Sequence, residues 1–180
     1  DNMYIGSING GVLYFDTSNN YTNHTIISSG IPDNSVLDIK IDSEGKPWFI
    51  SPAAGLIVDL GNGGPWGSFN TVNSDMPANS LLCVMHGTQG EIFIGSESNG
   101  LLTKVENEYL QLTTSNSNIT DNHILCITKG NNEDLWVGTN NGGICKIETS
   151  PINQLIELNN FQVTPNNIQC GEELHFSQNI

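Results

Sequence analysis

The sequence predicts an all-β protein built from a repeated unit of four short antiparallel strands, and three observations support this prediction. Short runs rich in Ile, Val, Leu and aromatic residues are separated by turns rich in Gly, Asn, Asp and Pro, a pattern typical of strands and hairpins. No window of about 11 residues between these turns has the i, i+3, i+4, i+7 apolar spacing of an amphipathic helix. Three sequence blocks also recur in a constant order along most of the chain.

The first block is a strand that carries an aromatic residue and leads into a glycine-rich turn. Its aromatic residues are spaced by 44, 45 and 43 positions and are Tyr4, Trp48, Phe93 and Trp136. Two residues further on, three of the four copies have a glycine, at Gly6, Gly95 and Gly138. Because the block packs each unit against the next, we expect Trp136 to be buried between units, at a cost of about 3–5 kcal/mol if it is truncated to Ala.

In the second block an asparagine opens each new apolar run, at Asn34, Asn79 and Asn122. A residue that recurs once per unit serves the unit itself, so we expect these side chains to bond nearby backbone. The third block is a turn between the first two strands of a unit, at 42–45, 87–90 and 130–134.

One complete unit is expected to have strands at 36–42, 46–51, 56–60 and 66–72. A four-stranded antiparallel unit repeated every 40–50 residues or so is typical of a β-propeller blade. The sequence therefore predicts an incomplete β-propeller over residues 1–148, with one partial blade and three repeats of about 44 residues.

These blocks resemble the two-component regulator propeller repeat, in which an Asp-x-x-Gly turn, a Trp-Ile/Val-Gly-Thr strand and an Asn-Gly-Gly-Leu turn follow one another. The segment 136–144 is closely similar to that pattern, and 93–101 and 4–12 are also similar. The segment 48–56 departs from it, with Ile50 and Ser51-Pro52 in place of Gly-Thr. The resemblance covers residues 1–148. It implies a part of the periplasmic sensory region of a hybrid histidine kinase, or of a secreted protein from the Bacteroidetes.

The chain opens at the second strand of a blade, whereas closed propellers have about four to eight blades. We therefore expect this sequence to be the C-terminal part of a longer protein. The alternative is a short propeller closed by oligomerisation, since open blade edges favour aggregation.

After residue 148 the repeat stops. Residues 149–160 are expected to be a linker, with one strand at 155–158 that could complete the last blade. Residues 161–180 begin Phe-Gln-Val-Thr-Pro-Asn-Asn and resemble the opening of a type IX secretion C-terminal sorting domain, with Asn167 where that pattern has a second Pro. The resemblance implies contact with the secretion machinery. Because the segment falls outside the phase of 43 to 45 residues, we expect it to contribute no strand to a blade. The alternative is an ordinary strand pair that begins another β-domain.

Charge excludes several classes of partner. The chain has 19 acidic and 5 basic residues, a formal net charge of −14, and no Arg among its basic residues. Nucleic acids, phosphate groups and anionic membrane surfaces are all disfavoured, because their recognition depends on Lys and Arg. Uncharged or cationic ligands, such as glycans or peptides, are favoured.

The sequence offers no pattern typical of a catalytic or metal site. There is no Cys-x-x-Cys, no histidine pair at metal-ligand spacing and no nucleophile elbow or phosphate loop. Cys83 and Cys126 occupy equivalent strand positions and are expected to be small buried hydrophobes, too far apart for a disulfide. We expect no cofactor and no metal. Calcium at 16–20 or 131–134 is the alternative to ordinary solvated turns.

Ligand contacts are expected at loop positions that vary from blade to blade, because strand interiors are committed to packing. The loops that join second to third strands, and fourth strands to the next first strand, share one face of a propeller. On that face the candidate ligand-binding residues are Asp33, Glu97, Asn99, Asp121, His123, Asn140 and Asn141.

The function favoured by these features is a non-enzymatic ligand-binding or sensing portion of a secreted or surface-exposed bacterial protein, with the periplasm as the alternative location. An enzyme of the propeller lyase or glycan-hydrolase kind would need His and carboxylate side chains clustered across blades. A structural spacer is the third interpretation.

Overall fold

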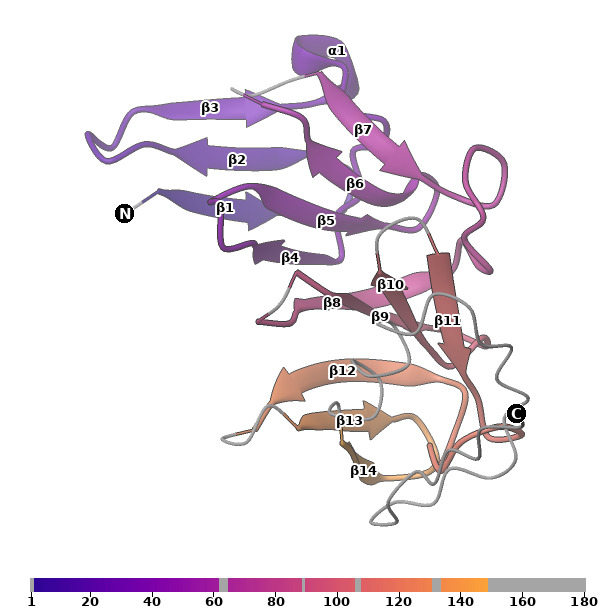
Figure 1. Ribbon diagram of the computed structural model, residues 1–180. Helices are drawn as coiled ribbons and strands as arrows, with labels where there is room; N and C mark the ends of the chain where they lie inside the picture. Colours follow the sequence, from indigo (N-terminus) through magenta and orange to yellow (C-terminus); the bar gives the residue numbers. More distant parts are fainter. Residues whose placement is uncertain (1, 62–64, 89, 106–107, 131–133, 149–180) are drawn as a thin grey trace, which may run out of the picture.

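A computed structural model describes residues 2–61, 65–88, 90–105, 108–130 and 134–148. Within these residues the chain forms fourteen strands and one four-residue helix. The strands make four antiparallel sheets that follow one another along the chain in a curved stack (Figure 1). No helix in the described part of the chain has the length and hydrophobicity needed to cross a bilayer.

Each sheet is one blade, formed by consecutive strands. The first blade comprises β1 (Met3–Gly6), β2 (Val12–Phe15) and β3 (Tyr21–His24). The second comprises β4 (Asp38–Ile41), β5 (Pro47–Ser51), β6 (Gly55–Asp59) and β7 (Trp66–Phe69). The third comprises β8 (Leu81–His86), β9 (Ile92–Ser96), β10 (Leu101–Val105) and β11 (Glu108–Leu112). The fourth comprises β12 (Ile124–Lys129), β13 (Leu135–Thr139) and β14 (Ile144–Ile147).

The first strands of successive blades lie side by side, β4 against β8 and β8 against β12 (Figure 1). The first blade begins at the equivalent of a second strand, as the repeat phase predicts. The all-β, incomplete propeller fold expected from the sequence is therefore confirmed. The predicted linker, the strand at 155–158 and the sorting-type tail lie outside the described residues.

Among the described residues the hydrophobic core consists of three separate clusters, one between each pair of neighbouring blades. Between the first and second blades the cluster contains Val12, Ile31, Val36, Phe49, Ala54 and Ile57, with Tyr4, Ile39 and Trp66 packed against it. Between the second and third blades it contains Ile50, Leu56, Met76, Ala78, Leu81, Val84, Ile92, Ile94 and Leu102. All residues of β6 and β9 are buried, because these inner strands have a blade on each side.

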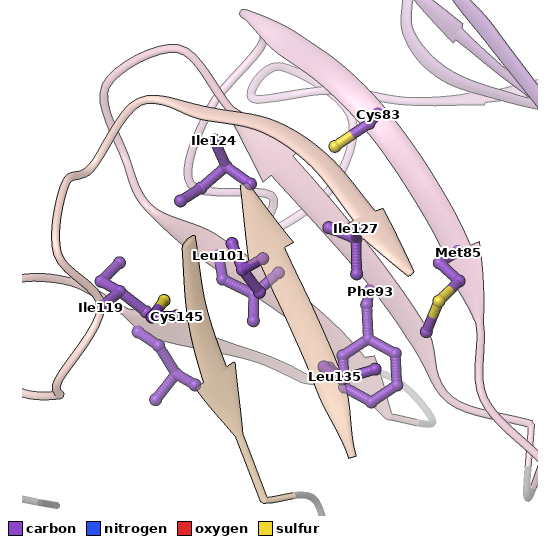
Figure 2. Close-up of a cluster of buried hydrophobic side chains, with 11 residues drawn as sticks. Cys83, Met85, Phe93, Leu101, Ile119, Ile124, Ile127, Leu135 and Cys145 are labelled. Atoms are coloured by element: carbon purple, nitrogen blue, oxygen red, sulfur yellow. The ribbon is translucent and has the colours of Figure 1, made fainter. Parts of the chain in front are cut away.

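Figure 2 shows the cluster between the third and fourth blades, where side chains of the two sheets point toward one another. Phe93 is 1% exposed here and packs in one cluster with Leu135 and Val137. Gly95 allows the sheets to approach closely: a Cβ at this position would lie 2.7 Å from Cγ2 of Ile124 in the next blade. Gly6 has the same role, since its Cβ would lie 2.7 Å from Cγ1 of Val36. The recurring glycine is therefore a packing requirement of the blade interface.

The recurring asparagines hold the turn that follows each fourth strand. The side-chain oxygens of Asn34, Asn79 and Asn122 each accept a hydrogen bond of 2.8 Å from a backbone N–H eight residues earlier. In the first of these turns, which forms helix α1 (Ile26–Ser29), Thr25 caps the helix and Gly30 ends it with a φ of 70°. The predicted backbone-bonding role of these asparagines is thus present in all three copies.

Two expectations about burial are wrong. Trp136 is 43% exposed, and Cys126 is exposed as well, whereas Cys83 is 6% exposed as predicted. Phe93 and Cys83 face the blade that follows theirs, as β12 and β13 cover them. No following blade is present among the described residues to cover the corresponding face of β12–β14, so Trp136 and Cys126 lie on an open surface.

Replacing Phe93 with Ala should destabilise the protein by about 3–5 kcal/mol, because a large buried aromatic leaves a cavity between two blades. The equivalent Trp136→Ala should cost much less, about 1 kcal/mol, since much of that ring is in solvent. Urea-denaturation midpoints followed by circular dichroism measure both variants. Equal losses in the two variants would contradict the assignment of these interfaces.

Gly95→Ala should destabilise the protein by about 1–3 kcal/mol, the usual range for overpacking. Its Cβ would meet Sγ of Cys83 at 2.5 Å as well as Ile124 of the next blade. Gly138→Ala is the matched control, because its Cβ would approach only the thiol of the exposed Cys126, at 2.7 Å. The same denaturation assay should show a clear loss for Gly95→Ala and a small one for Gly138→Ala.

Candidate functional site

We call the face that carries the predicted ligand-binding residues the loop face. Its loops are tied together through their backbones. Between blades, the amide of Gly11 donates to the carbonyl of Asn34 at 2.8 Å, and that of Gly100 donates to Asn122 at 2.9 Å. Within the third blade, the amide of Glu97 donates to the carbonyl of Ser80 at 2.8 Å. The loop backbones are thus fixed relative to the blades that carry them.

Asp33 and Asp121 occupy equivalent positions in front of β4 and β12, and both bond to their own blade. The Asp121 carboxylate accepts from the amide of Asn141 at 2.9 Å and from that of His123 at 3.1 Å. Hydrogen bonds from the Asn141 and His123 amides lower the pKa of Asp121 below its ordinary value.

Asp33 accepts from the hydroxyl of Ser51 at 2.5 Å and from the amide of Ser35 at 3.2 Å. Burial raises the pKa of Asp33, but the hydrogen bonds from Ser51 and from backbone amides outweigh it and keep the pKa below the ordinary value. Both carboxylates therefore position the loops in which they lie.

The structure brings four of the seven predicted residues together. Asp121, His123, Asn140 and Asn141 all lie at one end of the fourth blade, where the amide of Asn140 also donates to the carbonyl of His123 at 3.0 Å. Asn140 and Asn141 are exposed, and His123 is half-buried.

Glu97 and Asn99 belong to the third blade, in the turn between β9 and β10. Glu97 is exposed, whereas Asn99 is half-buried. The backbone carbonyl of Asn99 accepts from the side-chain amide of Gln111 at 2.8 Å, and its backbone amide donates to Oγ of Ser96 at 2.8 Å. Asp33 lies in front of the second blade, so the third blade separates it from the other group. Of the seven candidate residues, those with exposed side chains are Glu97, Asn140 and Asn141.

A groove that the sequence analysis missed opens on the opposite face, between the second and third blades. Its volume is about 370 Å³. The turns β4–β5 and β8–β9 and the ends of β6 and β7 form its walls. The residues that line it are Asp42, Ser43, Glu44, Lys46, Trp48, Val58, Asp59, Leu60, Phe69, His86, Gly87, Gly90 and Ile92.

Trp48 is held in this groove by a polar contact. Its Nε1–H donates to Oδ2 of Asp42 at 2.9 Å, and Oδ1 of Asp42 accepts from the amides of Glu44 and Lys46. Burial raises the pKa of Asp42, but the hydrogen bond from Trp48 and those from the two amides outweigh it, so the pKa lies below its ordinary value.

His86 packs edge-on against Trp48, with ring centroids 5.5 Å apart. Its Nε2 is buried and has no hydrogen-bond partner. Burial lowers the pKa of His86, and the neighbouring Asp42 carboxylate offsets this only in part. The ring is therefore neutral at physiological pH.

The sequence contains one signal for the groove. Asp42, which opens the turn at 42–45, stands six residues before Trp48. That aspartate is absent from the other blades, where Gly87 and Gly130 open the equivalent turns. The turn thus differs between blades, and such variation is what a binding position is expected to show.

Asp16 lies in the first of the two segments for which calcium binding is the alternative to a solvated turn. Its carboxylate accepts hydrogen bonds from the amides of Ser18 and Asn20 and from the side-chain amide of Asn20, at 2.8–2.9 Å. These bonds close the turn between β2 and β3. The other candidate, 131–134, falls largely outside the described residues.

One comparison links part of the chain to a known repeat. Residues 118–141, which run from the turn before β12 into the turn after β13, match the family model described as "Two component regulator propeller". No curated protein sequence matches the chain.

Several solved structures have a similar fold. The extracellular domain of the hybrid two-component system BT3049 from B. thetaiotaomicron has a TM-score of 0.70 at 21% identity, over 83% of this chain and 20% of that one. PorZ, a surface component of the type IX secretion system of Porphyromonas gingivalis, has a TM-score of 0.62 at 18% identity, over 84% of this chain and 24% of that one. Virginiamycin B lyase from Staphylococcus aureus has a TM-score of 0.55 at 15% identity, over 78% of this chain and 49% of that one.

The likeness to these structures defines the class of the fold: the described chain is an incomplete β-propeller. The chain spans only 20% and 24% of the first two proteins. At these identities the likeness establishes the fold.

The loop-face carboxylates predict a pH dependence of stability. A pKa that is lower in the folded state than its value of about 3.9 in an unfolded chain stabilises the fold above that value. The stabilisation is lost as the pH falls from about 4 through the lower folded pKa. The double variant D33N/D121N should therefore lose less stability than the parent over this range, as measured by denaturation midpoints. An unchanged acid slope would contradict the structural role given to the two carboxylates.

Proposed function

We propose that residues 1–148 form a ligand-binding part of an extracellular sensory propeller, and that the ligand is bound on the loop face. The observation that carries this proposal is the contrast between a fixed loop backbone and exposed polar side chains at Glu97, Asn140 and Asn141. Side chains presented by a fixed backbone lose little conformational entropy on binding. The same fold in the extracellular domain of a two-component system supports the assignment to a sensory role at the cell surface.

The chemistry of the loop face suits glycans or peptides. Asparagine amides both donate and accept hydrogen bonds, as sugar hydroxyls and peptide groups require, and a single carboxylate strengthens a bond to a hydroxyl or an amine. The chain has no Arg with which to clamp an anion. Neutral or amine-bearing ligands are therefore the class we assign to this face.

Two other functions are less well supported. Virginiamycin B lyase has a related fold, and a histidine variant of it is described as catalytically inactive. His123 is the one histidine among the seven candidate residues, and the neighbouring Asp121 carboxylate accepts a hydrogen bond from its backbone amide. A purely structural role would not require the exposed polar side chains of Glu97, Asn140 and Asn141 on the loop face.

Glu97→Ala and Asn140→Ala test the proposal in the 180-residue chain, after a glycan and peptide array has identified a ligand. Each variant should weaken binding by about 0.5–1.5 kcal/mol, the usual net value of one hydrogen bond, as measured by calorimetry. Thr17→Ala, in the exposed turn between β2 and β3 on the opposite face, is the matched control and should bind normally. Full binding by both loop variants would refute the loop-face assignment, and turnover of the ligand would show an enzyme instead.

A further inference from the structure

The groove between the second and third blades combines an apolar floor with an acidic rim. Trp48 and Phe69 are nearly parallel there, with an interplanar angle of 15° and ring centroids 6.4 Å apart. Val58, Leu60 and Ile92 add aliphatic surface. Its volume of about 370 Å³ lies within the range of small-molecule sites, about 300–1,000 Å³.

The charges around the groove are unequal. Its lining has three carboxylates, Asp42, Glu44 and Asp59, and a single ammonium, that of Lys46. Lys46 is already paired, because its Nζ lies 2.8 Å from Oε2 of Glu44. The groove is therefore negative overall, and the net charge of −14 on the whole chain adds to the field that a cation meets.

The three carboxylates of the groove differ in their exposure and in the hydrogen bonds that they already accept. Asp42 is occupied by Trp48 and by two backbone amides. Asp59 is 7% exposed and accepts from the amide of Gly61 at 2.8 Å. The Glu44 side chain is 70% exposed, and its ion pair with Lys46 at the surface is weak and exchangeable. Glu44 is thus the carboxylate that can turn to an incoming cation.

The rings of Phe69 and Trp48 differ in the groups that already lie beside them. The Lys104 ammonium lies 5.9 Å from the ring centroids of both Phe69 and Tyr109, so Phe69 already has a cation beside it. The His86 ring makes a T-shaped contact with Trp48, and it is neutral. An indole is the best side chain for holding a cation or a flat apolar group.

From these features we propose that the groove binds a small organic cation, a primary amine attached to a flat or aliphatic apolar body. The apolar body packs against Trp48, Val58 and Ile92, and the ammonium lies at the rim near Glu44. The site lies on the face opposite the one assigned to glycans or peptides, so it is a second binding site and does not depend on the function of the loop face.

The first measurement uses 2-phenylethylamine as the probe and 2-phenylethanol as its uncharged counterpart. Both are titrated into the 15N-labelled 180-residue chain, and the indole N–H resonance of Trp48, assigned with Trp48→Phe, is followed by NMR. The amine should shift this resonance saturably, with a Kd in about the millimolar range expected for so small a ligand. The alcohol should bind about tenfold more weakly or worse. Equal binding of the two probes, or no saturation with the amine up to about 50 mM, would overturn the proposal.

The second measurement compares two isosteric variants that each remove one exposed carboxylate. Glu44→Gln should weaken amine binding about two- to fivefold, the range expected for an exposed ion pair, and high salt should remove the difference. Glu148→Gln, in the fourth blade, is the matched control: its carboxylate is also exposed and also lies near a lysine, 3.9 Å from Nζ of Lys146, and the variant should leave amine binding unchanged. An unchanged Kd in Glu44→Gln would overturn the assignment of the ammonium to the rim. Loss of glycan or peptide binding in the loop-face variants leaves this result unaffected, so the two sites are tested separately.

Discussion

Burial between successive blades is the interaction on which the rest of this structure depends. A single four-stranded sheet has two faces and cannot cover either of them by itself, so each blade is stabilised by its neighbours. The three apolar clusters all lie between blades. Phe93, which is 1% exposed, shows how completely such an interface excludes water. A fully buried side chain of this size contributes about 1.5–3 kcal/mol.

Close approach of the blades then decides which residues are possible at particular positions. Gly6 and Gly95 leave room for Val36 and Ile124 of the next blade, and any side chain at either position would collide with them. Where the loops cross from one blade to the next, Asn34, Asn79 and Asn122 supply the acceptors that the turn amides need. The polar loops are therefore consequences of blade packing as much as surfaces for recognition.

The packing of the blades also places the two candidate sites on opposite faces of the molecule. On the loop face, Asp33 and Asp121 bond within their own blades, and the exposed side chains stand on a fixed backbone. On the opposite face, the turns β4–β5 and β8–β9 line the groove beside Trp48. The binding that we propose on the loop face uses exposed polar groups, whereas the groove offers an apolar surface with charge at its rim.

The sequence by itself determined the blade: its length, its strand order and the glycine and asparagine positions, because these follow from local periodicity and turn chemistry repeated in register. It also placed the candidate residues on one face. It failed at Trp136 and Cys126, which match Phe93 and Cys83 in position but have no following blade in the described chain to cover them. It missed the groove as well, since Trp48 and His86 are 38 residues apart and come from different blades. Only the tertiary structure decides such features, because burial and cavities depend on which neighbour lies against a side chain, and a repeat pattern specifies the side chain alone.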